Sequence, residues 1–298
     1  MSQAVRITDP REPSVTGTVR AYVELTKPRI IELLLTTTLP AMVLAADGWP
    51  GWWLAIATLI GGTLSAAGAN VINQVMDSDI DRVMRRTRGR PIPTHRVGEQ
   101  AAMVFGIILG IIGFVWLLVT TNLLAASLST IALLFYVVIY TLFLKRTSTQ
   151  NIVIGGAAGA IPPLVGWAAV TGSLSVPAWV LFGIIFFWTP PHFWALALRY
   201  DEDYQGAGVP MLPGIVGTAM TANHIVLYSF VTVGVSLLLA PWVGWIYLAA
   251  VVVLGAWLIA GAFHLRANSG MAMRYFTATN GYLAGVFLAV AIDVLVLG

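Results

Sequence analysis

Cysteine is absent from this chain of 298 residues, and charged residues are scarce, at 10% of the total. Without cysteine the chain can form neither a disulfide bond nor a thiolate metal site, and it gives no indication of its redox compartment. Hydrophobic residues, in contrast, make up 58% of the sequence. That balance leaves too little polar surface for a protein dissolved in water, so composition alone predicts an integral membrane protein.

Long apolar runs divide the chain, and each is about the length that crosses a bilayer as a helix. They lack the alternation of apolar and polar residues that a transmembrane barrel needs, and helices satisfy their backbone hydrogen bonds internally. The sequence therefore predicts an all-α polytopic membrane protein with nine transmembrane helices. These cover residues 30–46, 52–72, 101–119, 122–144, 151–171, 176–198, 219–240, 242–264 and 276–297.

The first residues carry no apolar run but contain Pro10, Pro13, Ser14 and Gly17. Residues 1–24 are therefore expected to form a flexible cytoplasmic arm rather than a cleaved signal peptide. No internal repeat and no long linker follows. Residues 25–298 are accordingly interpreted as a single intramembrane domain.

Basic residues indicate the orientation of the helices, because Lys and Arg accumulate in cytoplasmic loops. With nine helices and a cytoplasmic N-terminus, all 16 Lys and Arg residues fall on the cytoplasmic side, and the C-terminus lies outside. An eight-helix or ten-helix count breaks this pattern. Once topology accounts for these residues, the net charge of +3 leaves no surplus that would indicate nucleic acid as a partner. We expect a protein of the cell (inner) membrane with its active site toward the cytoplasm.

Oxygen-bearing side chains cluster at the cytoplasmic end of the second run, at Asn70, Asn73, Asp77 and Asp81. Spacings of three and four residues place all four on one helix face. Stacked carboxylates repel each other unless a cation lies between them, and hard oxygen donors are the ligands that Mg²⁺ prefers. The spacing predicts a magnesium site, and magnesium commonly accompanies a phosphate. The alternative is that loop acids merely solvate the helix end.

A second acidic cluster, Asp201, Glu202 and Asp203, follows Arg199 at another cytoplasmic helix end. Facing the first cluster, it could help hold two or more Mg²⁺ ions on a diphosphate. It lacks the helical spacing of the first cluster, so balancing of nearby arginines remains an alternative. Candidate ligands for the phosphate oxygens are basic residues of the cytoplasmic loops, each of which topology alone could also explain. They are Arg86, Arg90, Lys145, Arg146 and Arg199.

The spaced Asn73, Asp77 and Asp81, followed by Arg86 and Arg90, resemble the first aspartate-rich motif of the intramembrane aromatic prenyltransferase superfamily. Further blocks resemble the heme-farnesylating members of that superfamily. These blocks are Leu25–Arg29, Lys145–Pro163, Pro190–Trp194 and Ala207–Pro213. Two features depart from the superfamily pattern. Gln74 stands where Asp is common, and the three acidic residues of the second cluster are consecutive, without regular helical spacing.

The resemblance implies nine helices around a central cavity that both aspartate motifs cap, with Asp77, Asp81 and Asp203 as catalytic residues. It implies Mg²⁺ as cofactor, and farnesyl diphosphate and heme b as substrates. The product would be heme O, an intermediate on the route to heme A and cytochrome oxidase, with heme A synthase acting downstream. A quinone or chlorophyll precursor is the alternative acceptor, because it would use the same diphosphate site.

Three residues are candidates for contact with heme: His192, Trp194 and Tyr140. For His192, a neutral imidazole next to Pro190 and Pro191 suggests iron ligation, capping of backbone groups freed by the prolines, or a hydrogen bond to substrate. The aromatic rings could stabilise cations through their faces, although packing is the commoner role in membrane helices.

A function from another class, an ion-coupled carrier, is also compatible with broken helices and acidic sites. Pro190 and Pro191 would then form the helix discontinuity. A carrier, however, places its polar residues near the middle of the membrane, whereas those of this chain gather at one end. This distribution favours the enzyme.

Overall fold

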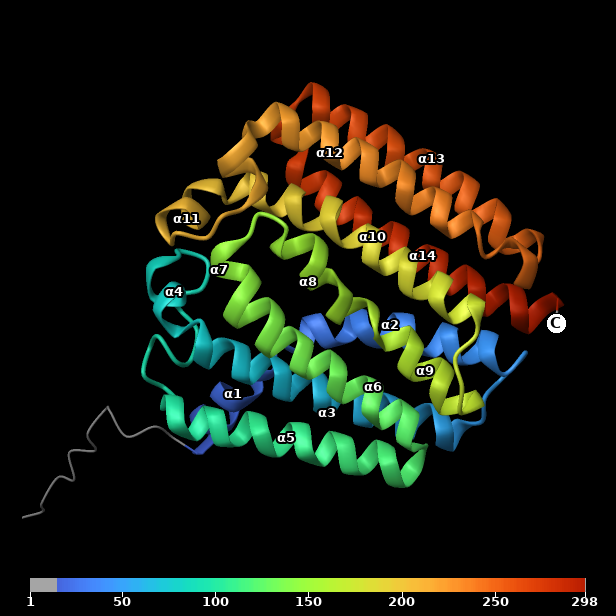
Figure 1. Cartoon of the computed structure of the whole chain (residues 1–298), viewed down its shortest axis with the longest axis horizontal. Coiled ribbons are helices and arrows are strands. Elements are labelled where there is room, and N and C mark those ends of the chain that lie inside the picture. The colour runs from blue at the N-terminus through green and yellow to red at the C-terminus, as the bar shows by residue number, and fades with distance from the viewer. Residues whose placement is uncertain (1–14, 298) are drawn as a thin grey trace, which may run out of the picture.

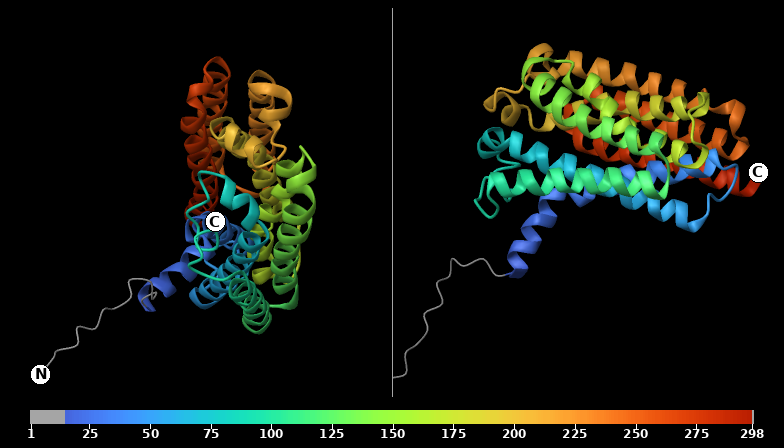
Figure 2. Two further views of the ribbon diagram at one scale, coloured as in Figure 1. Left: turned by 90° about the vertical axis from the view of Figure 1, so that its left-hand side faces the viewer. Right: turned by 60° about the horizontal axis from the view of Figure 1, so that its bottom comes forward.

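The computed structural model describes residues 15–297, apart from the side chains of residues 29, 30 and 32–35. Every regular element in this range is helical. Long helices lie side by side in one bundle, as Figures 1 and 2 show. The short helices α4 (Ser78–Val83) and α11 (Asp201–Gly206) lie at one end, which we call the polar end, and the chain ends at the other.

The bundle is built mainly from helices long enough to cross a membrane. They are α3 (Trp52–Met76), α5 (Glu99–Thr120), α6 (Leu123–Leu134) continued by the π-helix η1 (Phe135–Leu144) and α7 (Lys145–Thr147), α8 (Asn151–Ala160) continued by α9 (Pro162–Thr171), α10 (Val176–Arg199), α12 (Leu212–Leu237), α13 (Trp245–Ala267) and α14 (Ala272–Leu297). The remaining elements are α1 (Val15–Thr26), α2 (Pro28–Ala45) and the 3₁₀ turns η2 (Ala240–Trp242) and η3 (Ser269–Met271).

Eight helical segments of the described chain have the length and composition of a membrane span. They correspond to the second to ninth predicted runs, so the prediction of an all-helical, multi-pass membrane protein is confirmed. The first predicted run falls on α2, where the described apolar stretch, Thr36–Ala45, is shorter than a span. The ninth span and the orientation of the termini therefore stay predictions.

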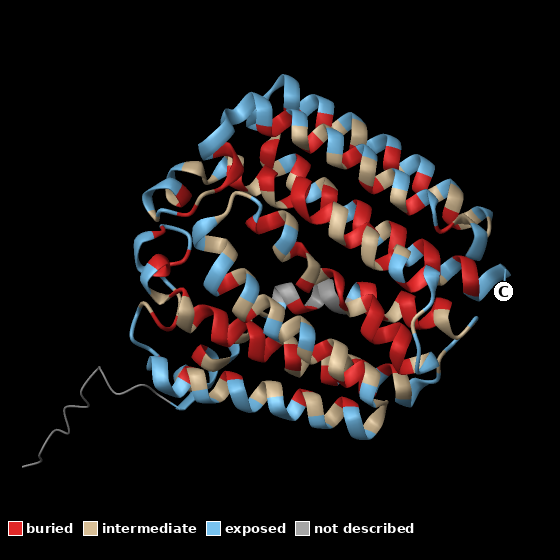
Figure 3. Ribbon diagram, viewed as in Figure 1, coloured by how far each residue is buried: buried red, intermediate tan, exposed pale blue. Residues whose placement is uncertain are grey.

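Buried residues line the faces that helices turn toward one another, whereas exposed residues cover the outside of the bundle (Figure 3). Many of the exposed residues are large and apolar. On α5, for example, Ile107, Ile111 and Val115 are exposed, while Gly106 and Gly113 are buried. A surface of this kind is stable in lipid, where apolar side chains meet hydrocarbon. The described helices thus present the exterior that the composition predicted.

Helix α1 occupies the second half of the segment expected to be a flexible arm, while residues 1–14 lie outside the described residues. Ala21 and Leu25 are buried there, in a cluster with Val71 of α3. The ring of Tyr22 meets that of Phe105 edge-on, at 5.0 Å between centroids. A single narrow stripe at helical spacing is enough to dock α1 on the bundle. This apolar stripe is too short to appear as an apolar run in the sequence.

Glycines allow α3 and α5 to approach at backbone distance, which fixes the helix that carries the first acidic motif. A Cβ atom on Gly68 would lie 2.7 Å from the carbonyl oxygen of Gly106, and one on Gly113 would lie 2.8 Å from the backbone nitrogen of Ser65. Small residues at such contacts are the usual means of close packing between membrane helices.

We expect Gly68→Ala to lower the free energy of unfolding in detergent by about 1–3 kcal/mol, because the new methyl group meets backbone that cannot yield. Gly62→Ala on the same helix is the matched control, since a Cβ there meets nothing within 4 Å. Thermal or denaturant unfolding of the two purified variants checks the difference. Equal stability would contradict the proposed tight contact.

Candidate functional site

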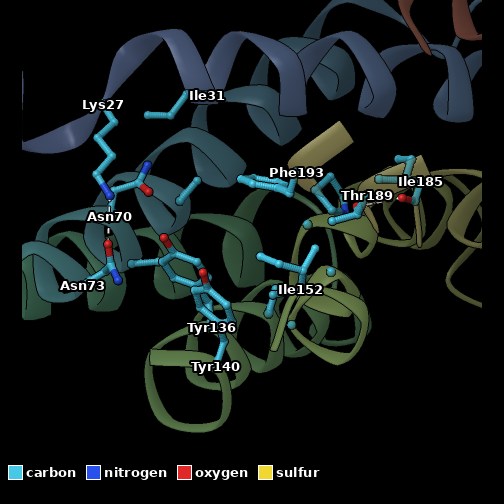
Figure 4. Close-up of a pocket in the computed structure, with 18 of the residues that line it drawn as sticks. Lys27, Ile31, Asn70, Asn73, Tyr136, Tyr140, Ile152, Ile185, Thr189 and Phe193 are labelled. Carbon is cyan, nitrogen blue, oxygen red and sulfur yellow. Dashed lines mark hydrogen bonds between the residues drawn. The ribbon is translucent and has the colours of Figure 1, made fainter. Parts of the chain in front are cut away.

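A cavity of about 480 Å³ opens inside the bundle, between α2, α3, η1, α8, α9, α10 and α14. Its volume is in the range of about 300–1,000 Å³ that is typical of small-molecule sites. Charged and amide side chains line it near the polar end, whereas small, aliphatic and aromatic residues line the rest. Figure 4 shows this wall, with Lys27, Asn70 and Asn73 on one side and Thr189 and Phe193 on the other.

All four residues of the first predicted motif line this cavity: Asn70, Asn73, Asp77 and Asp81. Helix α3 ends at Met76, but its hydrogen-bond pattern continues across the break. The amide of Asp77 donates to the carbonyl of Asn73 at 2.9 Å, and that of Asp81 donates to the carbonyl of Asp77 at 2.8 Å. The prediction that the motif shares one face is confirmed, because these bonds keep the helical register into α4.

Each buried carboxylate of the motif is paired with one cation. Asp77, which is 1% exposed, accepts a hydrogen bond from Lys145 at 2.5 Å and one from Asn73 at 2.8 Å, both at Oδ2. Asp81, which is 2% exposed, forms an ion pair with Arg90 at 2.6 Å. Oδ1 of Asp77 is also buried but has no partner among the described residues. Because buried acceptors are almost always satisfied, this atom marks a place for a further ligand.

Lys27 belongs to the site, although sequence reasoning included it only in a motif and gave it no role. It links α1 to α2 in a left-handed conformation, with φ of 54°, and lines the cavity. Its Nζ donates to Oδ1 of Asn73 at 2.8 Å, as the dashed line in Figure 4 shows. Burial first, and then the charge of Arg90, lowers the pKa of Lys27 well below its usual value. The residue brings a further amine donor to Asn73, beside the pair formed by Asp77 and Lys145.

The five predicted phosphate ligands separate into two groups. Arg86, Arg90 and Lys145 line the cavity. Arg146 instead donates two hydrogen bonds of 2.7 Å to Asp79 and lowers the pKa of that carboxyl to about 2. Arg199 lies over the ring of Tyr200, at 5.7 Å from its centroid. Neither of these two lines the cavity in the described structure.

The second acidic cluster does not line the cavity, contrary to the expectation that it faces the first. Glu202 is 90% exposed, and Arg85 bonds both Glu202 and Asp203, at 3.3 and 3.4 Å. Asp201 accepts a hydrogen bond from Gln205 at 2.8 Å. The described residues contain no group of three or more His, Asp or Glu side chains poised around a metal position. Consecutive acids on one short helix point in different directions, which explains the difference.

Two stacked tyrosines form part of the cavity wall. The rings of Tyr136 and Tyr140 lie 5.5 Å apart and nearly parallel, with an interplanar angle of 16°. Both belong to the π-helix η1, where the hydroxyl of Thr141 donates to the carbonyl five residues earlier, that of Tyr136. A Cβ on Gly155 would overlap the ring of Tyr140, so this glycine lets the ring lie flat against α8. Thr141 also accepts from Asn73, which connects η1 to the first motif.

His192 lines the cavity between two aromatic rings. Trp188 lies 4.3 Å from it and Phe276 lies 4.2 Å from it, both nearly parallel to the imidazole. Its Nδ1 is 2.7 Å from the hydroxyl of Thr279 on α14. The histidine thus bonds to a neighbouring helix and not to the backbone of α10 that the prolines free. The capping alternative is therefore wrong.

Trp194 does not line the cavity, contrary to the prediction from the sequence that it contacts heme. The cavity face of α10 presents Trp188, His192 and Leu196. Trp194 is two residues past His192, about 200° around the helix, which turns it to the opposite side. Its ring packs edge-on against Tyr228 at 5.1 Å.

Comparison with known proteins identifies related sequences over nearly the whole chain. The profile of the UbiA prenyltransferase family matches residues 34–290. Protoheme IX farnesyltransferase 1 of Saccharopolyspora erythraea is 52% identical over 93% of this chain and 90% of its own length. Protoheme IX farnesyltransferase of Mycobacterium avium is 50% identical over 98% of this chain and 97% of its own.

Solved structures with the same arrangement of helices include a digeranylgeranylglyceryl phosphate synthase. It aligns with a TM-score of 0.76 at 20% identity, over 93% of this chain and 99% of that one. A UbiA homologue from Archaeoglobus fulgidus, bound to GPP and Mg²⁺, aligns with a TM-score of 0.62 at 16% identity, over 91% of this chain and 99% of that one. At these identities the likeness concerns the fold.

We expect Arg90→Met to lower the free energy of unfolding by about 3–5 kcal/mol, because it leaves the buried carboxylate of Asp81 without a partner. The double variant Asp81→Asn/Arg90→Met should recover most of this loss, since it removes the uncompensated charge. Denaturant unfolding in detergent measures both. If the single and double variants unfold alike, the ion pair does not neutralise this carboxylate.

Proposed function

The chain belongs to the UbiA prenyltransferase family, and we propose that it transfers a farnesyl group from farnesyl diphosphate to a vinyl group of protoheme IX, which is heme b. The product is heme O, in which water adds a hydroxyl group to the former vinyl. The observation that carries this function is the pair of buried carboxylates, Asp77 and Asp81, at the polar end of a largely apolar cavity. The relatives named protoheme IX farnesyltransferase support heme as the acceptor.

Magnesium fits the first motif. The unpartnered Oδ1 of Asp77, the carboxylate of Asp81 and the amide oxygens of Asn70 and Asn73 form a row of hard oxygen donors along one wall. Oxygen ligands of this kind are those that Mg²⁺ binds in phosphate sites. When bound, the metal neutralises charge on the diphosphate. The Mg²⁺ and GPP in the Archaeoglobus fulgidus homologue support this assignment.

Cationic side chains of the cavity bind the diphosphate oxygens. Arg86 and Arg90 reach the cavity from the segment after α4, Lys145 from α7, and the amine of Lys27 from the turn before α2. Positioned cations stabilise a leaving group because its negative charge grows as the C–O bond breaks. Arg146 and Arg199 are left out of this set, since Asp79 and Tyr200 occupy them.

Ionisation leaves an allylic farnesyl cation, which bulk water would convert to an alcohol. The apolar wall excludes water from the farnesyl chain. The stacked faces of Tyr136 and Tyr140 stabilise the positive charge beside the diphosphate site. The electron-rich vinyl of heme then attacks the cation, so this step needs no deprotonated nucleophile. Tyr140 and His192 are the predicted heme contacts that the cavity retains.

We propose that the polar end faces the cytoplasm from the cell (inner) membrane, because basic loops accumulate on that side. Heme A synthase would act on the product downstream. Another aromatic acceptor would use the same diphosphate site, and an ion-coupled carrier would produce flux without a covalent product. Incubation of the purified protein with labelled farnesyl diphosphate and heme b separates these cases.

Replacement of either motif carboxylate should abolish heme O formation. We expect Asp77→Asn and Asp81→Asn each to reduce the rate by at least about 100-fold, because a metal-held diphosphate loses its anchor. Asp79→Asn is the matched control, since that carboxyl lies between the two in sequence but is 64% exposed. Chelation of Mg²⁺ should reproduce the loss in the unchanged protein. Activity at the normal rate in either motif variant would overturn the metal assignment.

Of the second cluster, we propose that Asp203 alone contributes to the reaction. Its side chain is 11% exposed, against 90% for Glu202, and the next residue, Tyr204, accepts a hydrogen bond from Arg86 of the cavity. Asp203→Asn should slow heme O formation about tenfold or more, whereas Glu202→Gln should leave it within about twofold, as a surface ion pair contributes little. Steady-state rates measure both. An equal effect of the two substitutions would remove Asp203 from the site.

A further inference from the structure

The hydrogen bonds around Nδ1 of His192 favour one tautomer of the imidazole. The hydroxyl of Thr279 lies 2.7 Å from the carbonyl oxygen of Phe276 and 2.7 Å from Nδ1 of His192. A hydroxyl has one hydrogen, and a carbonyl oxygen can only accept. Thr279 therefore donates to Phe276, and Nδ1–H of His192 donates to Thr279. Nε2 of the neutral ring is left with a free lone pair.

The imidazole that carries this lone pair lines the cavity at about the same distance from the polar end as the first motif. His192 is seven residues from the end of α10 at Arg199, and Asn70 is six residues from the end of α3 at Met76. At 1.5 Å per residue, both lie roughly 9–11 Å from the polar end, on different walls of the cavity. No group of the described residues donates to Nε2. A basic acceptor thus lies just below the diphosphate site.

Asn280 is a second polar group of the same wall. It follows Phe276 by one helical turn on α14, so it lies on the helix face that packs against His192. Its side chain lines the cavity, and its Oδ1 is buried without a partner among the described residues. An unsatisfied buried oxygen costs free energy, which one bound water removes. Water bound inside proteins needs two or more such partners.

We propose that His192 and Asn280 hold the one water molecule that the reaction consumes, and that Nε2 of His192 accepts its proton. This inference rests on the proposed function. With both hydrogens directed to these two acceptors, the water turns a lone pair toward the cavity. A single water fixed on one wall is compatible with a farnesyl chain that must otherwise remain dry.

Atoms and electrons balance in this step. The C–O bond of farnesyl diphosphate breaks, and its electron pair leaves with the diphosphate. The π pair of the vinyl forms a C–C bond between the terminal vinyl carbon and farnesyl C1, which leaves a cation on the carbon attached to the porphyrin. The water oxygen bonds to that carbon, and the proton it loses moves to Nε2. No oxidant or reductant is required.

The surroundings of His192 suit this transient charge. An attacking water becomes a strongly acidic oxonium group, so even a neutral imidazole in an apolar site accepts its proton. The faces of Trp188 and Phe276 lie against both sides of the ring and stabilise the resulting imidazolium. Thr279 keeps Nδ1 as the donor throughout. A nitrogen engaged with water is not an iron ligand, which separates this role from heme ligation.

The experiment follows the products of the purified full-length protein with farnesyl diphosphate, heme b and Mg²⁺ by mass spectrometry. Without a bound water, the porphyrin cation loses a proton and gives the farnesylated alkene, which is lighter than heme O by one water. We expect His192→Phe and Asn280→Leu to lower the ratio of heme O to alkene by about tenfold or more. His224→Phe is the control, because that histidine bonds the carbonyl of Met220 and does not line the cavity.

Substitutions of Thr279 provide a second test, because they leave the imidazole of His192 in place. Thr279→Val removes the acceptor that fixes the tautomer and should shift the product toward the alkene, whereas Thr279→Ser should retain the normal ratio. Water labelled with ¹⁸O reports the hydroxyl source in each variant.

Several outcomes overturn the inference. They are an unchanged product ratio in His192→Phe and Asn280→Leu, the loss of all prenylated heme from a folded His192→Phe variant, or a heme absorption spectrum that loses axial ligation in that variant. The first removes the water site, the second places His192 at an earlier step, and the third assigns Nε2 to iron. Failure of the proposed function is distinct, since the unchanged protein would then form no prenylated heme.

Discussion

Neutralisation of two carboxylates inside a lipid-embedded bundle is the constraint on which the polar end depends. Asp77 and Asp81 are almost fully buried, and an isolated charge at such a position is very costly. Lys145 after η1 and Arg90 after α4 supply the opposite charges. The pair of Asp77 and Lys145 joins segments 68 residues apart, whereas that of Asp81 and Arg90 fixes the segment directly after α4. The two pairs also bring together the cations that a diphosphate needs.

The cavity combines a charged end with a largely apolar interior, and the two parts serve opposite requirements. A diphosphate requires charge and hydrogen bonds, whereas an allylic cation requires the absence of water. The sequence separates them along each helix. On α3, Asn70 and Asn73 are near the polar end, and Gly62 and Ala66 of the same cavity face lie deeper. His192 is the polar exception on α10, and the aromatic rings on both sides isolate it.

Periodicity and composition predicted the features that repeat along a helix. The apolar runs, the helical class and the common face of Asn73, Asp77 and Asp81 all follow from spacing within one segment. Features that depend on how a short helix turns at the bundle end were not accessible. The second acidic cluster and Arg146 are charged and lie near the site in sequence, yet each faces another partner. Lys27 and Thr279 are ordinary in sequence, and only contacts between distant segments reveal their roles.

The π-helical geometry of η1 ties the charge balance of the site to chain length. Its hydrogen bonds span five residues, so this stretch winds more slowly than the α-helix that leads into it. Ordinary helix of the same length turns through a larger angle over these residues, so it would rotate everything that follows out of its present register. Lys145 would then turn away from Asp77. A change in the number of residues here preserves the site only where the winding changes with it, so insertions and deletions should be rarer among natural variants than in the loops beside it.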